Sequence, residues 1–341
     1  MKSTFYRILS CFILSKSKRW EFIKKHTQKS IRMQLNEQLE QLNHIETKVD
    51  LLKEQINTVF HPKDIPAARG LDRTVQLISL EILKDVDRVC RKHNIRYWLD
   101  FGTLLGAMRH GGFIPWDDDI DISMTWDDFL RFKEVAASEL QESVACFPPG
   151  QWGKVAHKDF SPRTDEEWVL PFRGQASSKI FIALDIFPYH HLKEDWNRET
   201  AIDYIRNVCK DKTNACNRLE SECGYNYTTW EKVHDLFKAR EETIISPSPT
   251  NYMFMSLRWH WQNLPLYYPP RVARTCDIFP LQEIDFEGCR FMAPGQPEMW
   301  MWCVYGSYWK TKIFPSHLNL STADLSEIQK LVEHGKRLKC M

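Results

Sequence analysis

The chain has 341 residues, 43% of them apolar, and a formal net charge of +1. This length suits one large domain or two modest ones, and the near-neutral charge excludes a nucleic-acid binder that works through bulk positive charge. Ten cysteines without a CxxC pair indicate reduced thiols in a cytosolic setting rather than a disulfide framework. No apolar run has the length that a membrane-spanning helix needs.

Positive charge is concentrated in residues 1–33. This segment holds nine Lys or Arg and one acid, Glu21, so its charge is +8 and that of the remainder is −7. Bulky apolar residues such as Trp20 and Phe22 lie among the basic ones, a pattern that suits an amphipathic helix on an anionic membrane surface. The alternative is an ordinary N-terminal helix that packs on the domain.

Residues 34–60 carry a heptad pattern. Apolar residues recur every seven positions in two series offset by three, namely Leu35, Leu42, Val49 and Ile56, and Ile45, Leu52 and Val59. Such a pattern predicts a coiled-coil helix that joins copies of the chain into a homo-oligomer. Gln38 interrupts the pattern at one core position, and a single amphipathic helix packed on its own domain remains the alternative.

The rest of the chain alternates helical and strand-like patterns, which predicts an α/β domain over 65–320 followed by a C-terminal helix over 321–341. We expect a linker over 62–70 and a loop over 147–173. The expected helices lie at 71–93, 104–109, 127–140, 195–238, 297–305 and 321–339, the last with Thr322 as its cap. The expected strands lie at 95–99, 120–122 and 179–188, with two more around Glu287-Gly288.

Four aspartates within five residues form the most distinctive feature of the chain. Asp117, Asp118, Asp119 and Asp121 stand at the entry to an apolar segment, and Ile120 and Ile122 alternate with the last two of them. Side chains on a strand alternate between two faces, so Asp119 and Asp121 share a face, and Asp117 joins them if the strand begins early. Ionised carboxylates this close repel one another, and a hard cation such as Mg²⁺ or Mn²⁺ is their natural partner. The alternative is an acidic loop that caps the following helix.

Two further features complete a candidate phosphate-transfer site. Gly102-Thr103 precedes a helix, where backbone N–H groups and a hydroxyl can contact donor phosphates. Asp185 is a lone acid within the apolar run KIFIALDIFP, where it can accept a proton from an attacking hydroxyl. A turn acid at the end of a strand, before Pro188, is the alternative for Asp185. A metal-binding pair of acids with a third acid on a later strand is the layout of nucleotidyltransferase-like domains, which have a small mixed sheet.

Cysteine spacing in the second half suggests one helix face. Cys209, Cys216 and Cys223 recur every seven residues. Zinc binding by these thiols is conceivable, but a half-buried helix face is the simpler interpretation, since a free cysteine behaves as a small hydrophobe.

The run YWLDFGTLLGAMRHGGFIPWDDDID, from Tyr97 to Asp121, resembles the signature of the LicD family. Later stretches are similar to that family as well, namely LDIFP (184–188), FPLQEIDFEG (279–288) and 294–309 with YGSYW at its end. Together they cover roughly 65–315. The family includes bacterial phosphocholine transferases and is similar to the fukutin-related transferases.

The resemblance implies roles for individual residues. Asp117, Asp119 and Asp121 would hold the metal, and Asp185 would be the base or a further ligand. Gly102 and Thr103 would contact the donor phosphates. The resemblance also implies that Arg109 and His110 contact the donor diphosphate. The alternative is that both are surface polar residues in a turn.

The resemblance also implies the activity: metal-dependent transfer of phosphocholine or a polyol phosphate from a CDP-linked donor to a glycan hydroxyl, with release of CMP. With the basic N-terminus, it suggests a bacterial enzyme of lipopolysaccharide or capsule synthesis. Such an enzyme would work on a lipid-linked glycan at the cytoplasmic face of the membrane. A nucleotidyltransferase that uses a nucleoside triphosphate and a non-catalytic coiled-coil scaffold are the alternatives.

Overall fold

The computed structural model describes residues 65–146, 153–161, 180–223, 227–257, 270–306 and 323–339. All of them lie in the compact unit formed by residues 62–341. The basic segment 1–33 and the heptad segment 34–60 lie outside the described residues. Among the described helices, none is long and apolar enough to cross a membrane.

The helices are α3 (Gly70–Lys92), α4 (Phe101–His110), α5 (Trp126–Glu139), the 3₁₀ turn η2 (Lys158–Phe160), α7 (Arg198–Cys223), α8 (Tyr227–Glu242), α9 (Thr275–Ile278), α10 (Pro297–Tyr305) and α11 (Leu325–Arg337). The strands are β1 (Trp98–Leu99), β2 (Ile120–Thr125), β3 (Val144–Cys146), β4 (Lys154–His157), β5 (Ala183–His191), β6 (Tyr252–Met255), β7 (Val272–Arg274), β8 (Gln282–Phe286) and β9 (Cys289–Ala293).

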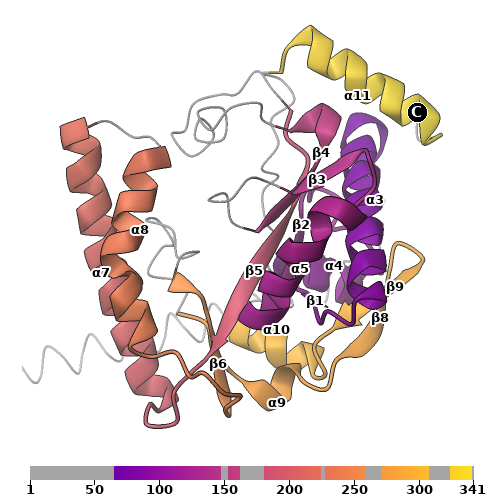
Figure 1. The fold of residues 1–341 in the computed structure, drawn as a ribbon. Coiled ribbons are helices and arrows are strands. Elements are labelled where there is room, and N and C mark those ends of the chain that lie inside the picture. The colour runs from indigo at the N-terminus through magenta and orange to yellow at the C-terminus, as the bar shows by residue number, and fades with distance from the viewer. Residues whose placement is uncertain are drawn as a thin grey trace, which may run out of the picture. The chain divides into compact units, whose positions relative to one another are not determined.

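Strands β1 to β7 form one mixed sheet with β2 and β5 at its centre (Figure 1). These two strands are parallel, and the other pairs in the sheet are antiparallel. β2 occupies one edge of β5, while β4 and β6 follow each other along the opposite edge. Helices α3 and α5 pack against β2 and β5, and α11 packs on α3. The structure therefore confirms the predicted α/β class with a mixed sheet flanked by helices.

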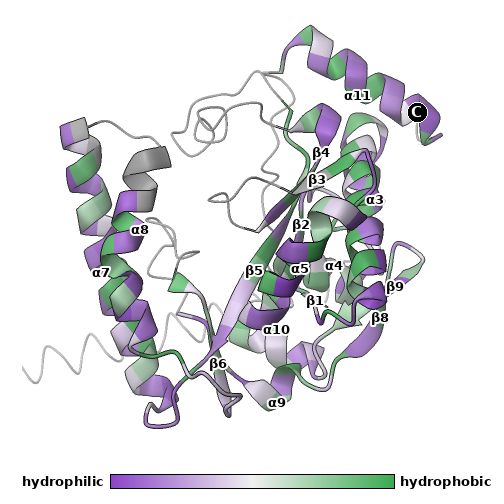
Figure 2. Ribbon diagram, viewed as in Figure 1, coloured by the Kyte–Doolittle hydropathy of each residue, from purple (hydrophilic) through white to green (hydrophobic). Residues whose placement is uncertain are grey.

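The hairpin of α7 and α8 has a small apolar core of its own. Polar and apolar residues alternate along both helices (Figure 2). Their apolar residues meet residues of β6 and β7, and Leu192 just after β5, in a cluster that includes Ile205, Val208 and Phe254. The main core is separate and holds the buried residues of α3, β2, β5 and α10. The aspartates belong to the part of the fold that this main core supports.

Several predicted boundaries were wrong. The segment 147–173 was predicted as a loop, but it contains β4 and η2, because a four-residue strand is too short to show a periodic pattern. Helix α4 begins at Phe101 rather than Leu104, since the Asp100 carboxylate accepts a hydrogen bond from the Phe101 N–H and caps the helix. Helix α11 begins after Asp324 and not after Thr322. Strand β5 continues through Pro188 to His191, so Asp185 is not a turn acid at the end of a strand.

Candidate active site

The central parallel pair of strands brings two predicted carboxylates together. In the ladder of β2 and β5, Asp121 lies directly opposite Asp185. Opposed residues on neighbouring strands project from the same face of a sheet. Ile120 and Ile122 are fully buried on the other face, as the alternating pattern predicted. The register therefore joins two acids that lie 64 positions apart in the sequence.

Strand β4 adds a cation to this row. Lys154 lies opposite Asp185 in the antiparallel ladder of β4 and β5, and its ammonium forms an ion pair with the Asp185 carboxylate. Sequence reasoning missed Lys154, because it lies in the segment predicted as a loop. Asp121, Asp185 and Lys154 thus form a row across three adjacent strands.

The loop before β2 supplies the remaining acids. Carboxylate oxygens of Asp117, Asp118 and Asp119 lie within 4.8 Å of one another, a spacing that can hold a metal ion. Burial raises the pKa of Asp121 well above its usual range, and the charges of Asp119, Asp185 and Asp117 raise it further. The predicted acids therefore lie close enough to affect one another's charge. Asp118, to which the sequence analysis assigned no role, belongs to the same group of carboxylates.

The first turn of α4 fits closely around these acids. A Cβ atom on Gly102 would lie 2.6 Å from Oδ2 of Asp117, so only glycine leaves room for this carboxylate. The Thr103 hydroxyl accepts a hydrogen bond of 2.8 Å from the backbone N–H of Asp121. Phe101 has a φ of 44°, an uncommon backbone conformation for a side-chain-bearing residue. Gly102 and Thr103 lie at the carboxylates, as expected, and each of them positions an aspartate.

Asp100, immediately before α4, is a further functional residue that sequence reasoning missed. Its fully buried carboxylate accepts hydrogen bonds from Phe101 N–H, from the Ser123 hydroxyl at 2.6 Å and from Trp300 Nε1 at 2.7 Å. Burial raises the pKa of Asp100, and the positive charge of Arg271 opposes that rise. The signal was available: like Asp185, Asp100 is a lone acid beside an apolar strand.

Arg109 and His110 lie at the opposite end of α4 from Gly102 and Thr103. Seven residues of helix separate Gly102 from Arg109, which corresponds to roughly 10 Å along the axis. Arg109 is only 7% exposed, and both ring nitrogens of His110 are buried without a hydrogen-bond partner among the described residues. Burial lowers the pKa of His110 to about 4, and the charge of Arg109 contributes. Along α4, the backbone of this pair therefore lies about two helical turns from Gly102 and Thr103.

Gln76, on α3, holds the loop that carries Asp117. Its buried amide nitrogen donates to the carbonyl oxygens of Asp117 at 2.8 Å and Ile114 at 3.2 Å. The amide oxygen of Gln76 accepts a hydrogen bond of 3.1 Å from Arg73. Gln76 therefore holds the backbone of the loop that carries Asp117.

Glu287, in the turn between β8 and β9, holds the same loop from the other side. Its carboxylate makes two hydrogen bonds with Arg73, at 2.6 and 3.0 Å, and accepts a third from Phe113 N–H. Burial alone raises the pKa of Glu287, but these hydrogen bonds outweigh it and the net shift is downward. A Cβ on Gly112 would lie 2.4 Å from the Glu287 carboxylate, and one on Gly106 would lie 2.4 Å from the Gly112 carbonyl oxygen. Gly106 and Gly112 therefore serve this close packing, whereas Gly111 supplies the left-handed backbone conformation that ends α4.

The cysteines of α7 fit the simpler interpretation. Cys216 is buried, and burial raises the pKa of Cys209 to about 11, so the thiol stays protonated at neutral pH. Among the described residues, neither thiol belongs to a cluster with metal-ligand geometry. The side chain of Cys223 lies outside the described residues.

Comparison with known proteins places the site in a family. Residues 94–217 match the family described as LicD/FKTN/FKRP, nucleotidyltransferase domain. The lipopolysaccharide cholinephosphotransferase LicD of Haemophilus influenzae is 37% identical over 109 residues, which are 32% of this chain and 35% of that protein. The human ribitol 5-phosphate transferase FKRP is 29% identical over 149 residues, which are 42% of this chain and 28% of that protein. The matched part of the chain thus spans about a third of these relatives or less. Residues 94–217, which match the family, include Asp100, the four clustered aspartates and Asp185.

Proposed function

We propose, from the premise that residues 94–217 belong to the LicD family, that this chain is a phosphotransferase acting on glycans. In this proposal it transfers phosphocholine or a polyol phosphate from a CDP-linked donor to a glycan hydroxyl and releases CMP. The observation that carries it is the parallel register of Asp121 and Asp185 beside the cluster of Asp117 to Asp119. The two relatives are a cholinephosphotransferase and a ribitol 5-phosphate transferase, which supports the class of group transferred.

The donor set of the site fits a hard divalent cation. Every candidate ligand is a carboxylate oxygen, and the raised pKa of Asp121 reflects negative charges that a cation would relieve. Asp117, Asp119 and Asp121 would hold Mg²⁺ or Mn²⁺, with Asp118 within reach. When bound, the ion supplies neutralisation of the charge that develops on the leaving phosphate.

The chain's own residues would do the rest. The N-terminus of α4, at Gly102 and Thr103, would place the positive end of the helix dipole next to the donor phosphates. Asp185 would accept the proton of the attacking hydroxyl, with Lys154 ion-paired to it. Arg109 and His110 remain proposed donor contacts, although the length of α4 argues for a more distant part of the donor.

A panel of CDP-linked donors tests the activity. The purified chain is incubated with CDP-choline, CDP-ribitol or CDP-glycerol and a glycan acceptor, with Mg²⁺ or with EDTA, and released CMP is measured. We expect CMP from one donor and only with the divalent ion. No CMP from any donor would contradict the proposal.

Placement of a labelled nucleotide separates this reaction from the alternative, a nucleotidyltransferase that uses a triphosphate. Labelled cytidine should appear as free CMP in the first case, and the labelled nucleotide should be attached to the acceptor in the second. A non-catalytic scaffold would yield neither product.

Calorimetry of donor binding in the presence of Mg²⁺ assigns the role of Asp185. If Asp185 is the base, Asp185→Asn should bind the donor normally and fail to transfer. If it is a metal ligand, donor affinity should fall as well.

The N-terminal segments supply proposals about location and assembly. Residues 1–33, with their charge of +8, would hold the enzyme on anionic lipid at the inner face of a bacterial membrane, where lipid-linked glycans are acceptors. Deleting them should abolish binding to anionic vesicles and spare turnover of a soluble acceptor.

Residues 34–60 would form a small oligomer through their heptad pattern. The double variant Leu42→Asp with Val49→Asp should then be a monomer by light scattering.

A further inference from the structure

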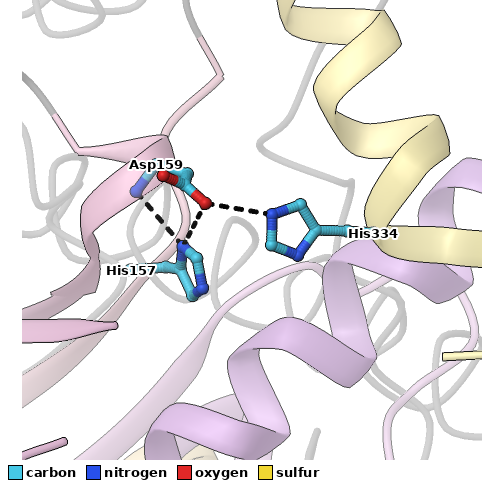
Figure 3. Close-up of side chains that lie close together, drawn as sticks. All are labelled: His157, Asp159 and His334. Carbon is cyan, nitrogen blue, oxygen red and sulfur yellow. Dashed lines mark hydrogen bonds and ion pairs between the residues drawn. The ribbon is translucent and has the colours of Figure 1, made fainter. Parts of the chain in front are cut away.

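A second cluster of metal-ligating side chains lies where β4 ends and the C-terminal helix packs. His157 is the last residue of β4, Asp159 lies in η2, and His334 projects from α11 (Figure 3). One ligand atom of each lies within 4.8 Å of the others. Although 177 positions separate the two histidines, the fold places their imidazoles 5.0 Å apart by ring centroid.

The distances suit a small ion between the three side chains. Oδ2 of Asp159 lies 3.1 Å from His334 Nε2 and 4.0 Å from His157 Nδ1. Ligands about 2.0–2.2 Å from a tetrahedral ion lie about 3.3 Å from one another. A small adjustment of the exposed Asp159 side chain would therefore complete the geometry.

The single lone pair of His157 Nδ1 takes part in a hydrogen bond within the cluster. His157 Nδ1 accepts a hydrogen bond of 3.2 Å from the Asp159 backbone N–H, so this nitrogen carries no proton. The same atom faces a carboxylate oxygen, which is also an acceptor (Figure 3). A cation bound at this nitrogen would replace the Asp159 N–H on that lone pair and would also take the place of the His334 proton beside the Asp159 carboxylate.

Both imidazoles are buried, and a neutral imidazole is the form that binds metal. His157 is 5% exposed and His334 is 8% exposed, and Phe160 packs against both rings. Burial lowers the pKa of His157, the charges of His334 and Arg337 lower it further, and Asp159 acts in the opposite direction.

We propose that His157, Asp159 and His334 form a binding site for a divalent transition-metal ion, with zinc as the first candidate. Two imidazoles and one carboxylate are borderline ligands that suit zinc better than magnesium. The Asp159 side chain is 58% exposed, so water can complete the coordination. The ion would link α11 to the end of β4. The first residue of that strand is Lys154, which forms the ion pair with Asp185.

Zinc titration of matched variants tests this site. The full chain is stripped with chelator, dialysed and titrated with Zn²⁺ by calorimetry in excess Mg²⁺, which occupies the all-carboxylate site. The variants are Asp159→Asn and His334→Ala. Asp285→Asn is the control, since it removes a carboxylate of β8 that is also exposed, at 79%. Asp159→Asn keeps shape and exposure, so it is not expected to unfold the chain.

We expect one Zn²⁺ equivalent in the parent chain and in Asp285→Asn, and an affinity at least about tenfold lower in Asp159→Asn and His334→Ala. Zn²⁺ should also raise the thermal unfolding midpoint of the parent and the control, and leave that of Asp159→Asn unchanged. Equal zinc affinity in all four proteins, or no bound equivalent in the parent, would overturn the proposal. Neither readout requires transferase activity.

Discussion

The two clusters of metal-ligating side chains differ in chemistry and in support. Asp117 to Asp121 and Asp185 offer only carboxylate oxygens and lie against the central strands, whereas the second cluster offers two imidazoles and one acid between β4 and α11. Gathered carboxylates repel one another without a cation, while neutral imidazoles tolerate an empty site. In these proposals, an ion would relieve the repulsion among the acids at the first site, whereas at the second it would only hold α11 against β4. The following predictions test that difference.

The largest expected effect is on catalysis, from Asp119→Asn. This change keeps the size of the side chain and removes one negative charge beside Asp121. CMP release from the CDP-linked donor should fall by at least about a hundredfold, comparable to the loss of one strong electrostatic stabiliser. Zinc binding at His157 and His334 should remain unchanged.

The matched control is Asp127→Asn, which alters an exposed acid in the first turn of α5. Its CMP release should stay near that of the parent. Near-normal turnover by Asp119→Asn would mean that the active site lies elsewhere.

Glu287→Gln should have the next largest effect, on both stability and activity. The variant loses the charged pair with Arg73 that supports the loop before Asp117. We expect the free energy of unfolding in urea to fall by about 1–3 kcal/mol. Turnover should fall on the order of tenfold, because misplaced ligands weaken catalysis less than absent ones.

Glu283→Gln, whose carboxylate pairs with Arg91 at the surface, is the control for that loss. It should change stability by no more than about 0.5 kcal/mol. Equal losses in the two variants would show that the Glu287 contacts do not support the loop.

A third effect appears only when the ion is removed. The pKa of Asp121 is raised from 3.8 in the folded chain, so its contribution to stability falls as pH rises from about 4 through the folded pKa. In EDTA at pH 7, Asp121→Asn should therefore unfold at higher urea than the parent, and each pKa unit is worth about 1.4 kcal/mol. The advantage should disappear near pH 4, and saturating Mg²⁺ should reverse it at pH 7.

Absence of any gain in EDTA would show that Asp121 is relieved by other groups. The equivalent change in the second cluster, Asp159→Asn, should bring no such gain, because its carboxylate faces histidines rather than acids.

The smallest effect concerns His110. Its folded pKa of about 4 lies below the ordinary 6.5, so its contribution to stability is complete above pH 6.5 and is lost as pH falls toward 4. His110→Gln removes this dependence and should recover about 1 kcal/mol at pH 5.5 relative to pH 7.5. Urea unfolding at the two pH values measures it, and a parent-like slope in the variant would contradict the assigned burial of the imidazole.

Local patterns predicted the part of the site that local sequence encodes. The alternation of Ile120, Asp121 and Ile122 predicted the faces of β2, and the apolar run around Asp185 predicted its strand. Asp119, which was predicted on the same strand face as Asp121, lies just before β2. The family resemblance predicted the class of fold. What these patterns lacked was register: nothing in either segment states that residue 121 lies opposite residue 185.

Contacts between distant segments escaped prediction for the same reason. Lys154 lies in a strand of four residues, too short for a period to be visible. Gln76 and Glu287 act through hydrogen bonds to a loop far away in the sequence. The sequence spacing of His157 and His334 matches no metal-binding motif, because only the tertiary packing of α11 near β4 brings the two residues together.

The bond from Trp300 to Asp100 has a consequence for biosynthesis. These residues are 200 positions apart, and Arg73 and Glu287 are 214 apart. A nascent chain that ends at residue 217 would hold every acid of the matched domain but neither the indole that pairs with Asp100 nor the carboxylate that holds the loop. Long-range closure of this kind slows folding and leaves partly folded intermediates exposed. We therefore expect the region that carries the acids to fold only after helix α10 has been synthesised, and shorter expression fragments to aggregate rather than fold.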